Sequence, residues 1–150
     1  MSMQIDPALK CMQVDGVRLA YREAGFPDHE PVVLVHGYPA NQRSWRHQIP
    51  VLGQSHRVKA VDLIGWGNSE RPRSLAFDYD TEGDRLGRVL DALGLAQVNL
   101  FGHDYGAWRS STRARREPLS RAGTRLSHWW VFWAARRVCA RWRRGCRWAR

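Results

Sequence analysis

The chain has 150 residues, 43% of them apolar, which is enough for one modest globular domain and excludes a large multidomain protein. Its 24 Lys and Arg against 14 Asp and Glu give a formal charge of +10, but the excess lies at one end. Residues 1–108 carry 11 basic and 13 acidic side chains, whereas residues 109–150 carry 13 Arg and one Glu. We therefore expect a domain over 1–108 and a separate basic tail over 109–150.

Cysteine usage and the lack of targeting signals narrow the class of protein. The three cysteines are odd in number and lack the close spacing of metal ligands, so the sequence predicts neither a disulfide framework nor a metal site, and no cofactor motif is present. Residues 1–10 lack the apolar core of a signal peptide, and the longest apolar run, 129–135, is too short to span a bilayer. These features predict a soluble cytoplasmic protein, and they specify no oligomeric state.

Turn and strand signals open the chain. The dipeptide Asp15-Gly16 is typical of a tight turn, and alternating apolar residues follow it, so an antiparallel hairpin is expected over 12–23. Residues 31–35 form a continuous apolar run rich in β-branched residues, which is the pattern of a strand buried on both faces of a sheet. This run ends abruptly at His36-Gly37-Tyr38-Pro39, where a loop is expected.

Helices and strands then alternate. Apolar residues at helical spacing predict a helix over 41–52 with Ser44 as its N-cap. A second buried strand is expected over 57–62, followed by a loop rich in turn residues. A helix with an apolar stripe is expected over 80–94, ending at a glycine, and a third strand over 98–101. This alternation predicts an α/β fold with parallel strands covered on both faces.

The segment after the third strand carries the clearest chemical signal. Gly102-His103-Asp104-Tyr105-Gly106 places a small residue two positions on either side of an aspartate, which is the pattern of a nucleophile elbow, a strained turn between strand and helix. The glycines allow the strand and the helix to pass closely. The helix N-terminus stabilises the carboxylate, so Asp104 is expected to be an ionised nucleophile suited to attack on saturated carbon. Taken alone, an aspartate here is also typical of a helix N-cap.

A second loop favours the nucleophile over the cap. His36-Gly37-Tyr38-Pro39 also follows a buried strand, and the backbone N–H of Tyr38 is expected to form an oxyanion pocket there together with the N–H of Tyr105. Two matched loops at the ends of two buried strands are far more specific than either loop alone. The sequence therefore predicts a catalytic centre with Asp104 as nucleophile and the Tyr38 and Tyr105 N–H groups as oxyanion donors.

Residues 1–108 resemble the N-terminal half of an α/β-hydrolase of the epoxide hydrolase and haloalkane or haloacetate dehalogenase branch. The resemblance rests on the two loops above together with WRHQIP at 45–50 and DLIGWGNS at 62–69, all in the family's order. It implies a two-step hydrolysis in which Asp104 displaces halide or opens an epoxide to give an alkyl ester, and a water activated by a histidine then cleaves that ester. It also implies a small epoxide or organohalide and water as reaction partners.

Within this branch the sequence favours an epoxide hydrolase. Many haloalkane dehalogenases place Asn after His-Gly and Trp after the nucleophile, as halide donors, and Tyr38 and Tyr105 depart from that pattern. The family's general base lies far downstream, so His36 and His103 are interpreted as structural residues of the two loops. Trp66 and the other large apolar residues are interpreted as core or loop packing.

The sequence after the elbow departs from the family. After Asp104 the only acid is Glu117 and the only histidine is His128, and neither follows a recognisable buried strand. The family's acid and base are therefore not assigned. The α/β-hydrolase sheet is expected to be truncated after the nucleophile elbow, with an unpaired edge, and the chain is expected to be inactive.

The basic tail has two interpretations. It contains 13 Arg and five Trp without Lys, Asn, Ile, Met or Tyr, which is typical of GC-rich codons and favours translation out of the family's reading frame, with an irregular or helical result. The alternative is a binding module for nucleic acid or anionic membranes, because Arg pairs with phosphate, Trp stacks on bases, and apolar residues over 131–149 fall near one helical face. The first is favoured, so neither nucleic acid nor membrane is an expected partner.

Overall fold

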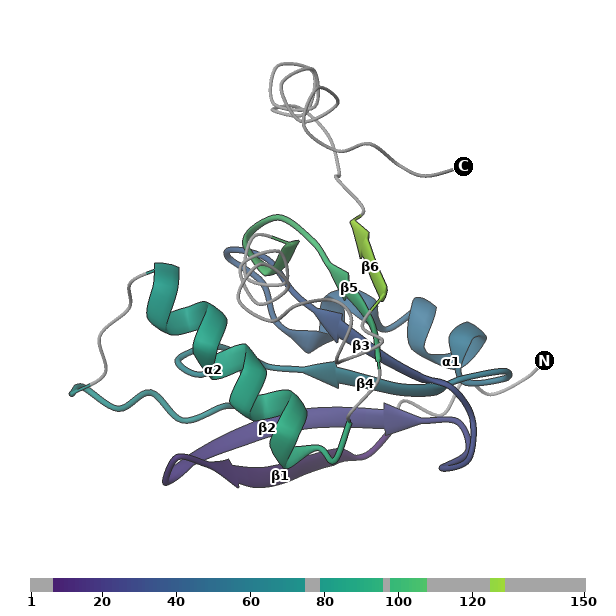
Figure 1. Ribbon diagram of the computed structural model, residues 1–150, viewed down its shortest axis with the longest axis horizontal. Coiled ribbons are helices and arrows are strands. Elements are labelled where there is room, and N and C mark those ends of the chain that lie inside the picture. The colour runs from purple at the N-terminus through teal and green to yellow at the C-terminus, as the bar shows by residue number, and fades with distance from the viewer. Residues whose placement is uncertain (1–6, 75–78, 96–97, 108–124, 129–150) are drawn as a thin grey trace, which may run out of the picture.

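The computed structural model describes residues 7–74, 79–95, 98–107 and 125–128 (Figure 1). Over these residues, six strands form one mixed sheet in the order β1-β2-β4-β3-β5-β6. The 3₁₀ helix η1 and helix α1 lie on one face of the sheet, and α2 lies on the other (Figure 1). The elements are β1 (Leu9–Val14), β2 (Val17–Ala24), β3 (Pro31–Val35), η1 (Gln42–Trp45), α1 (Gln48–Leu52), β4 (Arg57–Val61), α2 (Tyr79–Ala92), β5 (Asn99–Gly102) and β6 (Arg125–His128).

The predicted turns are confirmed. Strands β1 and β2 pair antiparallel with Val14 opposite Val17, and the two turn residues Asp15 and Gly16 have φ angles of 52° and 75°. Positive φ at both central residues is what the tightest hairpin turn requires, and Asp-Gly adopts it at little cost. Gly94, with a φ of 68°, ends the helical segment of α2 as predicted.

The parallel strands bring their carboxyl ends to one edge of the sheet. Strand β3 pairs in parallel with β4 on one side and with β5 on the other, and β5 pairs in parallel with β6. Strand β2 pairs antiparallel with β4, which makes the sheet mixed. The loops that follow β3, β4 and β5 therefore meet at the same edge, which is where an open α/β sheet places its ligands.

Two apolar clusters, one on each face of the sheet, form the core. Alternate residues of β3 enter both clusters, Val33 and Val35 on the α2 side and Val32 and Leu34 on the α1 side, as expected for a strand buried on both faces. The helices contribute the apolar residues that their spacing predicted. These are Ile49 on the α1 side and Leu86, Val89 and Leu90 on the α2 side.

The single helix predicted over 41–52 is wrong, since the structure has two short helices, η1 and α1. The cap is Asn41, whose side chain accepts a hydrogen bond from the N–H of Arg43 at 3.0 Å, so Ser44 is not the cap. Pro50 explains the break, because proline inside a continuous helix loses a hydrogen bond and clashes with the preceding turn, whereas the first turn of α1 tolerates it.

Strand β6 extends the sheet past the point where the sequence analysis ended it. Residues 125–128 pair in parallel with β5, with Asn99 opposite Arg125 and Gly102 opposite His128, so this part of the tail is neither irregular nor helical. Four residues in an Arg-rich segment are too few for a periodic strand signal. Pairing satisfies the backbone groups along the edge of β5 that the sequence analysis expected to stay open.

The rest of the basic tail lies outside the described residues, including the predicted helical face over 131–149. The predictions about that segment therefore stay predictions. In the part of the chain that the structure does describe, no helix combines the length and the hydropathy needed to cross a bilayer.

A charged cluster joins three strands away from the predicted catalytic loops. The carboxylate of Glu23 accepts hydrogen bonds from Lys59 at 2.6 Å, Lys10 at 2.9 Å and Arg57 at 3.0 Å. Burial alone would raise the pKa of Glu23, but these three cationic donors outweigh it and lower the pKa to about 2. Burial lowers the pKa of Lys59, an effect that its bond to Glu23 partly offsets.

Glu23 is therefore expected to make the fold sensitive to acid. Its pKa is about 2 in the folded protein and lower than the ordinary value of 4.5, so its contribution to stability is complete above pH 4.5 and is lost as the pH falls through 2. Glu23→Gln is expected to lower the free energy of unfolding at pH 7 by about 2 kcal/mol, because Lys59 loses its charged partner in a buried position.

Urea unfolding of wild type and Glu23→Gln at several pH values measures this effect. The stability difference between the two proteins should shrink as the pH falls from 4.5 towards 2. The exposed carboxyl of Glu30 offers a matched control, and Glu30→Gln should give a small difference at every pH. A Glu23→Gln difference that is the same at pH 7 and pH 2 would contradict the assignment.

Candidate active site

Asp104 lies at a strained turn between β5 and a helical turn. Its φ is 51°, a left-handed value that only a few per cent of residues other than glycine adopt. The N–H of Gly106 donates to the carbonyl of His103 at 2.9 Å and the N–H of Ala107 donates to that of Asp104 at 3.0 Å, so helical structure begins directly after the turn. This geometry is the elbow that the sequence predicted, and it leaves the Asp104 side chain exposed.

Three glycines make the close approaches at this turn possible. A Cβ atom on Gly102 would lie 2.5 Å from Cα of Ala107, and one on Gly106 would lie 2.4 Å from the carbonyl oxygen of His36. A Cβ atom on Gly37 would lie 2.6 Å from Cβ of Asp104. Gly37 and Gly106 are thus required by the contact between the two predicted loops, and Gly102 by the close approach of strand and helix within the elbow.

The loop after β3 is bonded to the elbow. The backbone N–H of Tyr38 donates a hydrogen bond of 2.9 Å to Oδ2 of Asp104, which brings together two residues that the sequence analysis selected separately. Tyr105, whose N–H was predicted as the second donor, is the first residue of the helical turn and directly follows Asp104 in the chain. The peptide bond between Tyr38 and Pro39 is cis.

His36 is a structural residue, as the sequence analysis interpreted it. Its side chain is buried, and its Nε2 accepts a hydrogen bond of 3.1 Å from the N–H of Leu63. Its Nδ1 lies 2.9 Å from the carbonyl oxygen of Gly37. Because Nε2 is an acceptor, the ring carries its proton on Nδ1 and is neutral. His36 therefore ties the loop after β3 to the loop after β4.

Asp62 is an organising residue that the sequence analysis did not single out. Its carboxylate is fully buried at the end of β4, where Oδ1 accepts from the N–H of Gln42 at 2.6 Å and Oδ2 accepts from the N–H of Asn68 at 2.8 Å. A Cβ atom on Gly67 would lie 2.4 Å from this carboxylate. Asp62 therefore fixes the shape of the loop after β4. The signal in the sequence is an aspartate that directly follows a buried strand.

Tyr38 and Trp66, in the loops that follow β3 and β4, form an aromatic pair. The rings of Tyr38 and Trp66 pack edge to face, with centroids 5.3 Å apart and an interplanar angle of 87°. Tyr38 is 66% exposed, whereas Trp66 is partly buried against the core cluster on the α2 side. The prediction that Trp66 packs in its loop is confirmed, but its contact with Tyr38 has no counterpart in the sequence pattern.

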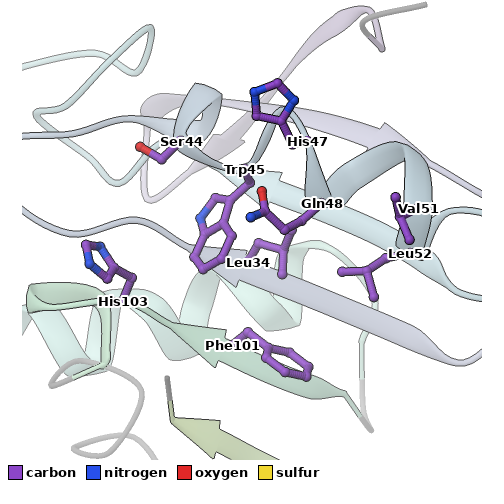
Figure 2. Close-up of a pocket in the computed structure, with 9 residues that line it drawn as sticks. All are labelled: Leu34, Ser44, Trp45, His47, Gln48, Val51, Leu52, Phe101 and His103. Carbon is purple, nitrogen blue, oxygen red and sulfur yellow. The ribbon is translucent and has the colours of Figure 1, made fainter. Parts of the chain in front are cut away.

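An apolar cavity of about 620 Å³ lies beside α1 (Figure 2), and Asp104 is not among the residues that line it. His103 is half-buried and lines this cavity, so it is a packed residue only in part. Trp45 lies in the middle of the lining and packs against the α1-side cluster, as predicted (Figure 2). The lining residues are Leu34, Ser44, Trp45, His47, Gln48, Val51, Leu52, Phe101 and His103.

Of the acid and the histidine that follow the elbow, the structure describes only the histidine. Glu117 lies outside the described residues. His128 is the last residue of β6, and its Cα is paired with that of Gly102, two residues before Asp104. A strand is thus present at His128, where the sequence showed no buried-strand pattern. The backbone places this histidine at the carboxyl edge of the sheet, on the strand next to β5, which leads to Asp104.

Known proteins are similar to this chain in both sequence and fold. Residues 30–118 match the family model described as alpha/beta hydrolase fold. Epoxide hydrolase A of Mycobacterium tuberculosis is 40% identical over 103 residues, which cover 67% of this chain and 32% of that protein. The haloalkane dehalogenase DbeA-M1 loop variant from Bradyrhizobium elkanii has a TM-score of 0.74 at 30% identity, covering 83% of this chain and 40% of that one. Epoxide Hydrolase A from Mycobacterium thermoresistibile has a TM-score of 0.63 at 38% identity, covering 69% and 33%.

The matched region contains the whole site. It includes Tyr38, Asp62 and Asp104, so the three loops at the carboxyl edge of the sheet belong to the shared part of the fold. The chain spans about a third of the length of the curated relatives it matches first. From the family match and the architecture of the sheet, the chain belongs to the α/β-hydrolase fold family, where its relatives include epoxide hydrolases and haloalkane dehalogenases.

Proposed function

We propose that Asp104 is a nucleophile that opens an epoxide or displaces a halide, forming a covalent alkyl ester. The observation that carries this proposal is the hydrogen bond from the Tyr38 N–H to Oδ2 of the exposed Asp104. With Oδ2 bound there, Oδ1 is the oxygen that attacks carbon. A new C–O bond forms, and the epoxide C–O or carbon–halogen bond breaks. The epoxide oxygen stays on the alkyl group as an alkoxide, which takes a proton from water and leaves hydroxide, whereas a halogen departs as halide.

The Tyr38 N–H serves both steps of this reaction. In the ester, Oδ2 becomes the carbonyl oxygen and keeps its donor. When water attacks the ester carbon, negative charge develops on Oδ2, and the donor already points at it. We propose that the N–H of Tyr105 is the second donor, since it belongs to the start of the helical turn, where the helix dipole also favours negative charge.

An epoxide is the preferred substrate class. A departing halide needs donors on the side of the carbon opposite to the nucleophile. Many haloalkane dehalogenases have these donors, an Asn and a Trp, at the positions that correspond to Tyr38 and Tyr105 in this chain. An epoxide keeps its leaving oxygen attached to the product, and that oxygen can take its proton from water. The pair of tyrosines therefore suits ring opening better than halide release.

Cleavage of the ester requires a base, and this step is expected to be slow in a polypeptide of these 150 residues. His36 is buried with its Nε2 already accepting a hydrogen bond, and His103 lines the cavity beside α1. We propose that residues 1–108 form the hydrolase unit, which supplies the nucleophile and its donors, and that the tail over 109–150 adds neither acid nor base.

Mass spectrometry of the intact protein tests this function. Incubation with styrene oxide is expected to add the mass of one substrate molecule, and digestion should place the addition on the peptide that contains Asp104. The adduct should accumulate over minutes to hours because it is cleaved slowly. Chloroacetate in a parallel incubation should react more slowly than the epoxide. Addition only to a cysteine, such as Cys11, which is exposed in the described part of the chain, would show ordinary alkylation of a thiol and would refute the proposal.

A further inference from the structure

We infer that Trp66 positions the ring of Tyr38 as a platform for an aryl group on the substrate, so that the site selects aryl-substituted over alkyl-substituted epoxides. The inference rests on the proposed function and names its substrate class. The two residues lie in the loops that follow β3 and β4, and their rings pack edge to face with centroids 5.3 Å apart.

Tyr38 has two contacts that point in different directions. Its backbone N–H is bonded to the carboxylate of Asp104 on the β5 side, at 2.9 Å. Its side chain instead packs on Trp66 on the β4 side and remains 66% exposed. The residue that binds the attacking carboxylate through its backbone N–H thus also carries an exposed ring, which Trp66 holds in place. Because this ring belongs to the residue whose N–H binds Oδ2, a substrate whose carbon reaches Oδ1 is expected to have its substituent near the ring.

The loop that carries Trp66 is held by backbone hydrogen bonds. The backbone N–H of Trp66 donates to the carbonyl oxygen of Leu63 at 2.9 Å, and the backbone N–H of Asn68 donates to the buried carboxylate of Asp62 at 2.8 Å. Gly67 has no room for a side chain against that carboxylate. The indole ring packs against the core cluster on the α2 side. A fixed indole restricts the rotamers of the tyrosine that packs on it, which lowers the entropy lost when a ligand covers the ring.

The expected selectivity is modest and measurable. Aromatic pairs gain an interaction beyond that of the buried area, which corresponds to about 2- to 10-fold in rate when the contact is made in the transition state. An alkyl chain of similar size buries area against Tyr38 but lacks the ring geometry. The two epoxides also differ in intrinsic reactivity, because the benzylic carbon of styrene oxide is activated. We therefore expect the ratio of the styrene oxide rate to the 1,2-epoxyhexane rate to be higher by about this factor in wild type than in a variant without the aromatic pair.

The test is the ratio of the two rates of ester formation at Asp104, measured by mass spectrometry under equal concentrations of each epoxide. Trp66→Leu should lower the ratio by about 2- to 10-fold below its wild-type value, and Trp66→Phe, which keeps an aromatic partner, should restore most of it. Tyr38→Leu keeps the backbone N–H and should also lower the ratio. Trp45→Leu changes a tryptophan in the separate cavity beside α1 and should leave the ratio unchanged.

The ratio distinguishes selectivity from a loss of structure, because partial unfolding lowers both rates together. An unchanged ratio in both Trp66→Leu and Tyr38→Leu would overturn the inference and leave the nucleophile intact. Absence of an ester at Asp104 with either epoxide would instead refute the proposed function itself.

Discussion

Replacement of Asp104 by Asn is expected to lower the rate of ester formation with styrene oxide by at least about a thousand-fold. The side chain of Asn has no negative charge on its oxygen, and the lone pair of its nitrogen is delocalised into the carbonyl group, so it attacks carbon poorly. The fold should persist, because Asn tolerates the left-handed backbone of this position and its oxygen can accept the hydrogen bond from the Tyr38 N–H. The rate is measured by intact-protein mass spectrometry, and the unfolding temperature reports the fold.

Asp104→Glu separates charge from geometry. This variant keeps the carboxylate but moves it by one methylene group, away from the Tyr38 donor. If position matters as well as charge, Asp104→Glu should lose most of the rate while it keeps its negative charge. A wild-type rate of addition in Asp104→Asn would mean that another residue is the nucleophile, and the proposed function would fail.

Gly106→Ala is expected to destabilise the protein by about 3 kcal/mol or more. The added Cβ atom would lie 2.4 Å from the carbonyl oxygen of His36 and 2.6 Å from that of Val35, and both are backbone atoms that cannot turn aside. The helical turn would have to move away from β3, and the bond between Tyr38 and Asp104 would be strained with it. Urea unfolding of purified wild type and variant measures the loss of stability.

Gly94→Ala is the matched control. Gly94 has a φ of 68°, which an alanine adopts with some strain, but an added Cβ atom would have nothing within 4 Å. We expect a loss of about 1 kcal/mol for this backbone strain alone. A loss in Gly106→Ala no larger than that in Gly94→Ala would contradict the tight contact at Gly106, since Gly106 does not have the positive φ that strains an alanine at position 94.

Local residue patterns predict much of this fold. The Asp15-Gly16 turn, the β-branched run that became β3 and the small residues around Asp104 each act within a few residues, so their structures are readable from short segments. The contact between Tyr38 and Asp104 was also predictable, because parallel strands bring their carboxyl ends to one edge. These features required only the spacing of apolar and small residues.

The features that were missed depend on the whole molecule. Pro50 divides the predicted helix, but it fits in the first turn of α1, so either outcome is compatible with the local sequence. Strand β6 exists because β5 offers an edge to pair with, and no pattern in residues 125–128 specifies this. Asp62 organises its loop by accepting hydrogen bonds from Gln42 and Asn68, which are distant from each other in sequence.

The bond between Tyr38 and Asp104 has a consequence for misfolding. Val35 is opposite Gly102 in the parallel pair of β3 and β5, and the donor and acceptor lie just beyond those two residues. If the strands paired one residue out of step, the two would separate by about 3.3 Å and one strand would turn its apolar side chains to the wrong face. A molecule with this error would lose both its apolar core and the hydrogen bond between Tyr38 and Asp104. Misfolded copies are therefore expected to be inert towards epoxides rather than unselective, because chemical reactivity depends on the same strand pairing as the folded state.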